Sequence, residues 1–157
     1  MKNNYLYNVI IDTNVIVSAI ISKNDNSPTV KILDLLFNDK INVYFSDEII
    51  NEYIDVLNRE KFKFDNNLVK TIIDTIISNG KNISPKSIDV ILKDMKDKPF
   101  YELVMDETIN DSKLITGNIK HFPIQTNIVT PRDFIDMYEG KIKWYLFATI
   151  IMKVFLH

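Results

Sequence analysis

The chain contains, close to its start, the stretch Val9-Ile10-Ile11-Asp12-Thr13-Asn14-Val15-Ile16-Val17-Ser18-Ala19. A short β-branched run occupies residues 7–11, and the apolar periodicity then changes to a helical one in residues 15–22. Thr13 or Asn14 can supply the cap that starts this helix. The stretch therefore predicts a strand, an acidic residue at its carboxyl end, and a helix.

Strands and helices alternate along the rest of the chain. Further strands are predicted at residues 41–45, 88–92, 113–116 and 127–129, and further helices at about 30–37, 47–60, 66–78, 100–108 and 131–137. This alternation requires crossover connections, which give a parallel sheet covered by helices on both faces. We therefore predict an α/β fold of three layers, with a mostly parallel central sheet flanked by helices. In such sheets the ligand site lies beyond the carboxyl ends of the strands.

The length and composition indicate one folded domain. A chain of 157 residues with 46% apolar and 25% charged residues can bury a core, but it is too short for two ordinary domains. We expect the domain to span residues 1–140. An apolar extension at 141–157 then packs on the domain or on a partner, since its uncharged run at 144–152 is far below the about 20 residues that cross a bilayer. Residues 1–7 lack the features of a secretory signal, so we expect a cytoplasmic protein without membrane contact.

The residue types available for chemistry point to a hard metal ion. The chain has no cysteine and two histidines, so oxygen atoms must supply most ligands, which favours Mg²⁺ or Mn²⁺. Carboxylate-bound ions of this kind support phosphodiester hydrolysis. The polar residues in or beside loops and helix starts that could take part are Asp12, Glu52, Asp94, Asp97 and Asn118. A net charge of -2 does not itself indicate a nucleic-acid partner. A protein with this charge can bind nucleic acid only if its acidic residues gather in one place and its lysines and arginines lie elsewhere.

Five segments of the chain occur in the order that is found in the PIN-domain nucleases. The first is the opening strand with its Asp-Thr-Asn. The others are Ser46-Asp47-Glu48-Ile49-Ile50-Asn51-Glu52, Lys96-Asp97-Lys98-Pro99-Phe100, Leu114-Ile115-Thr116-Gly117-Asn118 and Ile128-Val129-Thr130-Pro131-Arg132-Asp133-Phe134. No single segment is very specific, but the ordered set is. The sequence resembles the PIN-domain nuclease family over roughly residues 7–138.

The resemblance implies a role for particular residues. Asp12, Glu52 and Asp97 are the implied catalytic residues and metal ligands, and Asn118 assists them by a direct or water-mediated metal contact. The residues implied to orient the carboxylates or water are Thr13, Asn14 and Thr116. The implied activity is cleavage of single-stranded RNA by a VapC-like toxin of a type II toxin-antitoxin pair, with Mg²⁺ or Mn²⁺ as cofactor. The implied partners are the RNA, an antitoxin protein and a second copy of the chain.

Several alternatives remain open at this point. Asn118 stands where many members have aspartate, which weakens a second metal site, and Asp94 can replace or supplement Asp97. The protein can therefore also be a catalytically weakened PIN-like interaction module. A phosphoacceptor receiver domain fits less well, because Thr13-Asn14 and Thr130-Pro131 stand where that fold needs an acidic pair and a lysine.

Each candidate residue also has an ordinary structural explanation. Asp12 can simply cap the following helix, and Asn118 after a glycine is a natural turn residue. Glu52 and Asp97 can be solvated surface acids. The residues that can contact the RNA backbone are Lys98, Lys120, His121 and Arg132, although most lysines only solubilise a protein and a loop histidine is commonly structural.

Overall fold

The structure is a computed structural model, and it describes residues 6–141 and 151–155. The centre of the described part is a five-stranded parallel sheet with the strand order β3-β2-β1-β4-β5. Its strands are β1 (Asn8–Ile11), β2 (Asn42–Phe45), β3 (Lys81–Asn82), β4 (Ser112–Ile115) and β5 (Ile128–Val129). The predicted α/β fold with a parallel central sheet is confirmed.

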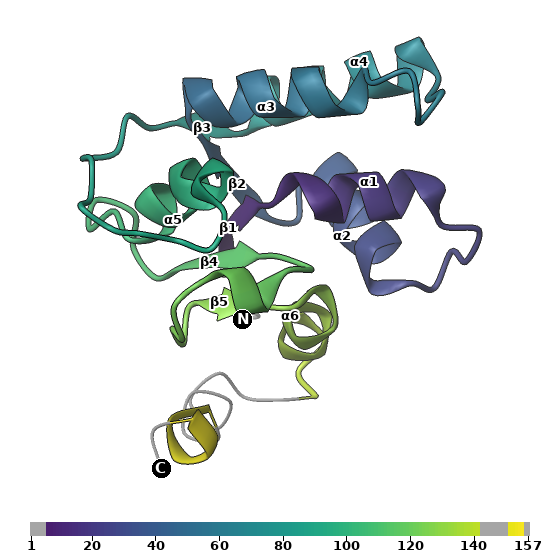
Figure 1. The fold of residues 1–157 in the computed structure, drawn as a ribbon. Helices are drawn as coiled ribbons and strands as arrows, with labels where there is room; N and C mark the ends of the chain where they lie inside the picture. The colour runs from purple at the N-terminus through teal and green to yellow at the C-terminus, as the bar shows by residue number, and fades with distance from the viewer. Residues whose placement is uncertain (1–5, 142–150, 156–157) are drawn as a thin grey trace.

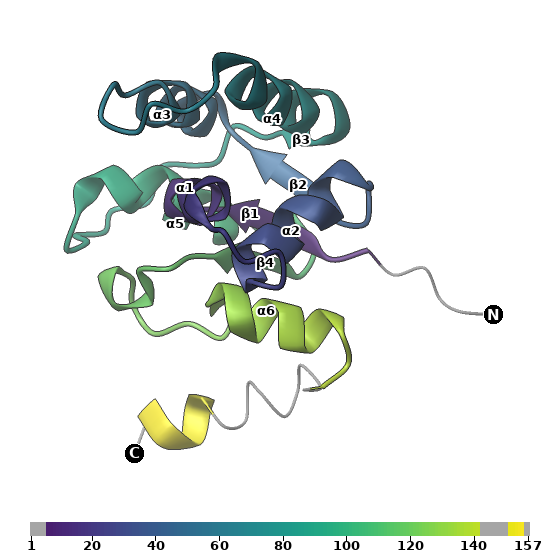
Figure 2. The ribbon, with the colours of Figure 1, turned by 90° about the vertical axis from the view of Figure 1, so that its right-hand side faces the viewer.

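Helices cover both faces of this sheet. They are α1 (Thr13–Ile21), α2 (Pro28–Phe37), α3 (Asp47–Leu57), α4 (Asn66–Asn79), α5 (Lys98–Val104) and α6 (Pro131–Tyr138), with short 3-10 helices η1 (Met95–Asp97) and η2 (Ile119–His121). Figure 1 shows α1, α2 and α6 on one side of the sheet and α5 on the other, with α3 and α4 beyond the β2 and β3 end. Figure 2 shows α3 and α4 side by side.

Most helix starts follow from side chains that accept a hydrogen bond from the backbone N–H three residues later. This bond satisfies one of the amide groups that the first helical turn leaves without a partner. Proline stands at the first position of α2 and α6, where its missing N–H costs nothing. The capping residues are Ser27 for α2, Ser46 for α3, Asp65 for α4 and Thr130 for α6.

The middle of the sheet lies between β1 and β4. Val9, Ile10 and Ile11 are fully buried, as expected for a central parallel strand covered on both faces. The chain passes from β1 through β2 to β3 and then returns to place β4 on the other side of β1. A reversal of this kind is where ligands bind in open α/β sheets. Because Ile11 pairs with Ile115, both strands end at the same level and present their next residues at this point.

The prediction of a strand at residues 88–92 was wrong. The segment has no strand partner, although it shows the alternation on which the prediction rested. Ile88 and Val90 pack against the core and Leu92 is buried, whereas Ile91 is exposed. The alternation therefore reflects an extended segment that packs on the domain without joining the sheet.

The edge strand β3 was missed by sequence reasoning. Its two residues, Lys81 and Asn82, are exposed, so they carry no apolar pattern, yet they pair with β2. The strand follows Gly80, where an added Cβ would lie 2.4 Å from the Ile76 carbonyl oxygen and 2.8 Å from that of Val43. Gly80 thus allows α4 to end close against β2.

The expected C-terminal extension at 141–157 falls mostly outside the described residues. Within the described part, Ile151 packs against the core and lines, with Phe155, Phe122 and Pro123, a pocket of about 360 Å³. In the two described ranges, no helix combines the length and the apolar character that crossing a membrane requires.

Candidate active site

Asp12 lies at the carboxyl end of β1 and is only 3% exposed. One carboxylate oxygen, Oδ2, accepts hydrogen bonds from Thr116 Oγ1 at 2.7 Å and from Asn14 Nδ2 at 3.0 Å. The residue occupies the N-cap position of α1, but its side chain makes no capping hydrogen bond. Helix capping therefore does not explain Asp12, and the prediction that Thr13 or Asn14 caps the helix was wrong.

The surroundings of Asp12 disfavour its charged form. Burial raises the pKa of its carboxyl group from an ordinary 3.8 to about 6. The hydrogen bond from Thr116 opposes this shift, whereas the charges of Asp97 and Glu52 add to it. Since charge effects of this kind fall off with distance, three acids from separate parts of the chain lie near one another at the end of β1.

Glu52 reaches this region from the middle of α3. It is half-buried at the edge of the helix face that buries Ile49 and Tyr53. Its Oε2 accepts a hydrogen bond of 2.6 Å from Thr13 Oγ1, which ties α3 to the start of α1. Burial raises the pKa of Glu52, the bond from Thr13 lowers it, and the charge of Asp97 raises it again.

Asp97 is the third acid, and it ends η1 just before α5. Its side chain is 13% exposed, and its Oδ2 lies 3.0 Å from Nδ1 of His121 in η2. Burial raises the pKa of Asp97, the hydrogen bond with His121 lowers it, and the neighbouring charge of Asp94 raises it. Among the residues expected to contact RNA, His121 is thus the one that the described structure joins directly to Asp12, Glu52 or Asp97.

Asp94 and Asn118 lie at the border of this cluster. Asp94 is exposed, and its Oδ1 accepts a hydrogen bond from the backbone N–H of Lys96 at 3.0 Å. Its charge nevertheless raises the pKa of both Glu52 and Asp97, so it lies close to the two. Asn118 is exposed and donates its backbone N–H to Thr116 Oγ1 at 3.0 Å.

Each of the three residues expected to orient the acids forms a hydrogen bond with one of the acids. Thr13 binds Glu52, while Thr116 and Asn14 bind Asp12. Asn14 also accepts a hydrogen bond of 2.9 Å from the backbone N–H of Gly117. The two loops that follow β1 and β4 are therefore linked by side chains as well as by the sheet.

The other residues expected to contact RNA lie at the periphery. Lys98 forms an ion pair with Glu102 at 3.6 Å, and Lys120 lines the apolar pocket beside Phe122. Arg132 is exposed in the first turn of α6. The structure therefore does not bring these three cations into contact with the acids.

Sequence reasoning missed two residues that act on the acids. Tyr53 is fully buried and donates its hydroxyl to the carbonyl oxygen of Ile11, the residue before Asp12. Burial, reinforced by the charges of Asp12 and Glu52, raises the pKa of Tyr53 well above its ordinary value. Arg59 carries a charge that lowers the pKa of Glu52. In the sequence, Tyr53 could be recognised only as part of the buried stripe of its helix. Arg59 could be recognised only by its position seven residues after Glu52.

The chemistry of these side chains suits a divalent cation, although their present arrangement does not form a closed cage. Carboxylate oxygens are the ligands that Mg²⁺ and Mn²⁺ prefer, and a cation would offset the burial and the repulsion between acids that raise the pKa values of Asp12, Glu52 and Asp97. Within residues 6–141 and 151–155, however, no group of three or more histidine or acidic side chains is placed so that it could hold a metal ion. Thr13 and His121 engage Glu52 and Asp97 instead.

Comparisons with known proteins show which family the chain belongs to. The family model described as the PIN domain matches residues 8–120, which include the three acids. The chain is also 30% identical over 146 residues to the uncharacterized protein MJ1680 of Methanocaldococcus jannaschii, covering 83% of this chain and 91% of that protein. No solved structure matches the chain. PIN domains are generally nucleases, and these nucleases generally use divalent metal ions. The chain belongs to the PIN domain family.

Proposed function

We propose that the protein is an endoribonuclease that hydrolyses phosphodiester bonds of single-stranded RNA with the help of Mg²⁺ or Mn²⁺. The observation that carries this proposal is the state of Asp12. Its carboxylate is almost fully buried, is held by two side chains and has a pKa raised to about 6 in the company of two further acids. Carboxylates that a fold collects at such a cost in free energy commonly serve a function.

The proposed roles of the residues follow from their contacts. Thr116 and Asn14 hold Asp12 in one orientation, and Thr13 does the same for Glu52. Asp97 completes the set from the start of α5. A divalent ion held by these three acids would activate water and offset the charge that develops on the phosphate. Burial of Asp12 limits competing water around that carboxylate and keeps its position fixed.

We further propose that the nuclease is the toxin of a type II toxin-antitoxin pair, active in the cytoplasm as a homodimer and silenced by an antitoxin protein. The support is the resemblance of the ordered segments to VapC-like toxins. A small gene directly upstream that encodes a DNA-binding protein would support this role, and inhibition of RNA cleavage by its purified product would test it. Absence of inhibition by that product would contradict the pairing.

The direct test of the nuclease proposal uses the purified full chain with single-stranded RNA and single-stranded DNA of the same sequence. We expect cleavage of RNA in Mg²⁺ or Mn²⁺ and its loss with EDTA or in Asp12→Ala. Equal cleavage by the Asp12→Ala protein would refute the assignment of the site. Faster cleavage of the DNA would refute the proposed substrate class and leave the site assignment in place.

A catalytically weakened interaction module is the second candidate. Two observations favour it: Asn118 stands at the fourth position, and the described acidic side chains do not form a ready metal cage. This candidate predicts that RNA or a protein partner binds without any cleavage in Mg²⁺ or Mn²⁺. Metal-dependent cleavage that requires Asp12 would exclude it.

A further inference from the structure

The loop that joins α3 to α4, residues 58–65, carries two aromatic rings that stack on each other. The ring centroids of Phe62 and Phe64 are 4.9 Å apart, and their planes differ by only 6°. The ammonium group of Lys61 lies 5.0 Å from the centroid of the Phe62 ring. We call residues 58–65 the α3–α4 loop. Aromatic side chains beside positive charge are the combination on which single-stranded nucleic-acid sites stack bases and hold the backbone.

The two phenylalanines are held differently. Phe64 is partly buried and packs against the hydrophobic core, so its ring has a fixed position. Phe62 is also partly exposed, but it is not among the described residues that pack against the core. Its ring is instead supported by Phe64. The loop thus offers an aromatic surface on a rigid base, which lowers the entropic cost of binding a flat group.

The charge of this segment differs from that of the whole protein. Residues 59–64 hold three cations, Arg59, Lys61 and Lys63, and one anion, Glu60, in a chain with a net charge of -2. Lys61 and Lys63 are exposed and form no ion pair with any residue that the structure describes. Arg59 forms an exposed pair with Asp55 at 3.1 Å. Two lysines are therefore available for phosphate groups.

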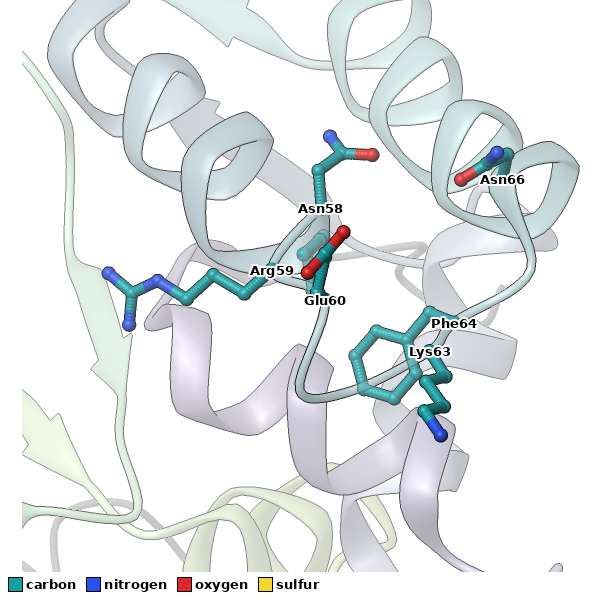
Figure 3. A pocket seen from close by; sticks show the side chains of 7 residues that line it. Asn58, Arg59, Glu60, Lys63, Phe64 and Asn66 are labelled. Atoms are coloured by element: carbon teal, nitrogen blue, oxygen red, sulfur yellow. The ribbon is translucent and has the colours of Figure 1, made fainter.

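A pocket of about 440 Å³ lies against the same loop (Figure 3). Figure 3 shows Glu60 and Phe64 beside the pocket with Asn66 across from them, while the Arg59 side chain extends away from Asn66. The Glu60 carboxylate can accept, and the Asn66 amide can both donate and accept, hydrogen bonds at the edge of a base. The negative charge of Glu60 makes this side unfavourable for a phosphate, which the lysines attract instead.

The loop is also placed next to the acidic cluster. α3 ends at Leu57, and Arg59 lies just beyond it, where its guanidinium pairs at 3.1 Å with Asp55, about one turn after Glu52 on the same face of α3. The charge of Arg59 lowers the pKa of Glu52, in agreement with this placement. A strand that passes the acids along this face of α3 would reach the loop within a short distance.

We propose that the α3–α4 loop binds single-stranded RNA beside the cleavage site, with a base stacked on Phe62 and phosphates contacted by Lys61 and Lys63. The proposal rests on the proposed function for the choice of RNA as the bound strand. It adds a binding surface that includes none of the three acids Asp12, Glu52 and Asp97 and none of the cations singled out from the sequence.

The first test measures binding of a fluorescein-labelled single-stranded RNA to the full chain by anisotropy, in EDTA so that cleavage does not interfere. Phe62→Ala should weaken binding by about 5- to 150-fold, the range for one base stacked on an aromatic side chain. Phe62→Trp should retain binding, because the ring surface is kept. The matched control is Phe37→Ala, which removes a phenylalanine that is 40% exposed at the end of α2 and should change little.

The second test separates phosphate contacts from stacking. The double variant Lys61→Ala/Lys63→Ala should reduce the slope of log affinity against log salt by about 1.4, since each phosphate contact on a single strand contributes about 0.7. RNA duplexes should show no dependence on Phe62, because their bases are already stacked and paired. The lysine variants touch neither the core nor the acids, so they test the loop even if Phe62→Ala unfolds.

The outcomes distinguish this inference from the nuclease proposal. Binding that depends on Phe62 without cleavage in Mn²⁺ supports the loop site and refutes the nuclease function. Cleavage with equal RNA affinity in wild type, Phe62→Ala and the lysine variant refutes the loop site alone. A wild-type protein that binds no single-stranded RNA also refutes it. If Phe62→Ala changes the sedimentation of the protein and leaves RNA affinity unchanged, the loop joins copies of the chain and the proposal is wrong.

Discussion

Thr116 Oγ1 donates a hydrogen bond of 2.7 Å to Asp12 Oδ2, although the two residues are 104 positions apart in the chain. The contact exists because β1 and β4 are neighbours in register, so that the residues after Ile11 and Ile115 emerge side by side. The backbone N–H of Asp12 donates to the carbonyl oxygen of Ile115 at 2.9 Å and fixes the same junction. The sheet itself therefore positions the central carboxylate.

Replacing Thr116 tests whether this hydrogen bond matters for function. Thr116→Val keeps the shape of the side chain but removes the donor, so the pKa of Asp12 should rise further above about 6. We expect the pH at which cleavage reaches half of its maximum to move upward and Mn²⁺ affinity to fall by about 10- to 100-fold. The control is Thr71→Val on the exposed face of α4, whose pH profile should match wild type. A Thr116→Val profile identical to wild type would remove Thr116 from the site.

The raised pKa of Asp12 makes stability depend on pH in a defined direction. The folded protein holds this proton more tightly than the unfolded chain, so the stabilising contribution is complete below pH 3.8 and is lost as the pH rises through about 6. In EDTA, Asp12→Asn should therefore gain up to about 3 kcal/mol over wild type between pH 4 and pH 8. Urea unfolding at both pH values measures this difference. An equal difference at both pH values would show that Asp12 ionises normally.

Tyr53 provides a test of the scaffold beneath the site. Tyr53→Phe leaves the buried carbonyl oxygen of Ile11 without its hydroxyl donor, which should lower the free energy of unfolding by about 1–3 kcal/mol. Tyr44→Phe is the control, because the Tyr44 hydroxyl has no hydrogen-bond partner among the described residues. Urea unfolding of both variants gives the comparison. Equal stabilities of the two would show that the Tyr53 hydroxyl contributes nothing.

Asn118 determines how many acids the site contains. Asn118→Asp adds a charge in the exposed loop whose backbone N–H contacts Thr116, so we expect tighter binding of Mn²⁺. Isothermal titration calorimetry measures the change, with Asn110→Asp as a control in another exposed loop. Unchanged or weaker binding would place the Asn118 side chain outside the metal site.

Much of the fold could be predicted because its signals are local. The β-branched run before Asp12, the helical stripe of α3 and the proline and threonine at the start of α6 each reflect packing or capping within one element. β3 could not be predicted, because two exposed residues carry no apolar pattern and pair only after β2 is in place. The segment 88–92 misled in the opposite way, since an extended chain that packs on the domain shows the same alternation as a strand.

The sequence allowed the residues of the site to be predicted, but not most of the contacts that these residues make. Asp12 follows a strand, Glu52 borders the buried stripe of a helix and Asp97 precedes a helix, so their order along the chain could be compared with a family pattern. The pairing of His121 with Asp97 depends on how η1 and η2 approach each other, which no local pattern specifies. Tyr53 was recognisable only as a buried residue, because its bond to Ile11 depends on the packing of α3 against β1.

Cleavage of end-labelled single-stranded RNA by wild type and Asp12→Asn in Mn²⁺ is the most direct test of a metal-dependent nuclease centred on Asp12. Asp34→Asn, an exposed acid of α2, is the matched control. We predict that wild type and Asp34→Asn cleave alike, that EDTA stops both, and that Asp12→Asn is slower by roughly 10²-fold or more. Cleavage by Asp12→Asn at the wild-type rate would contradict the central role of Asp12.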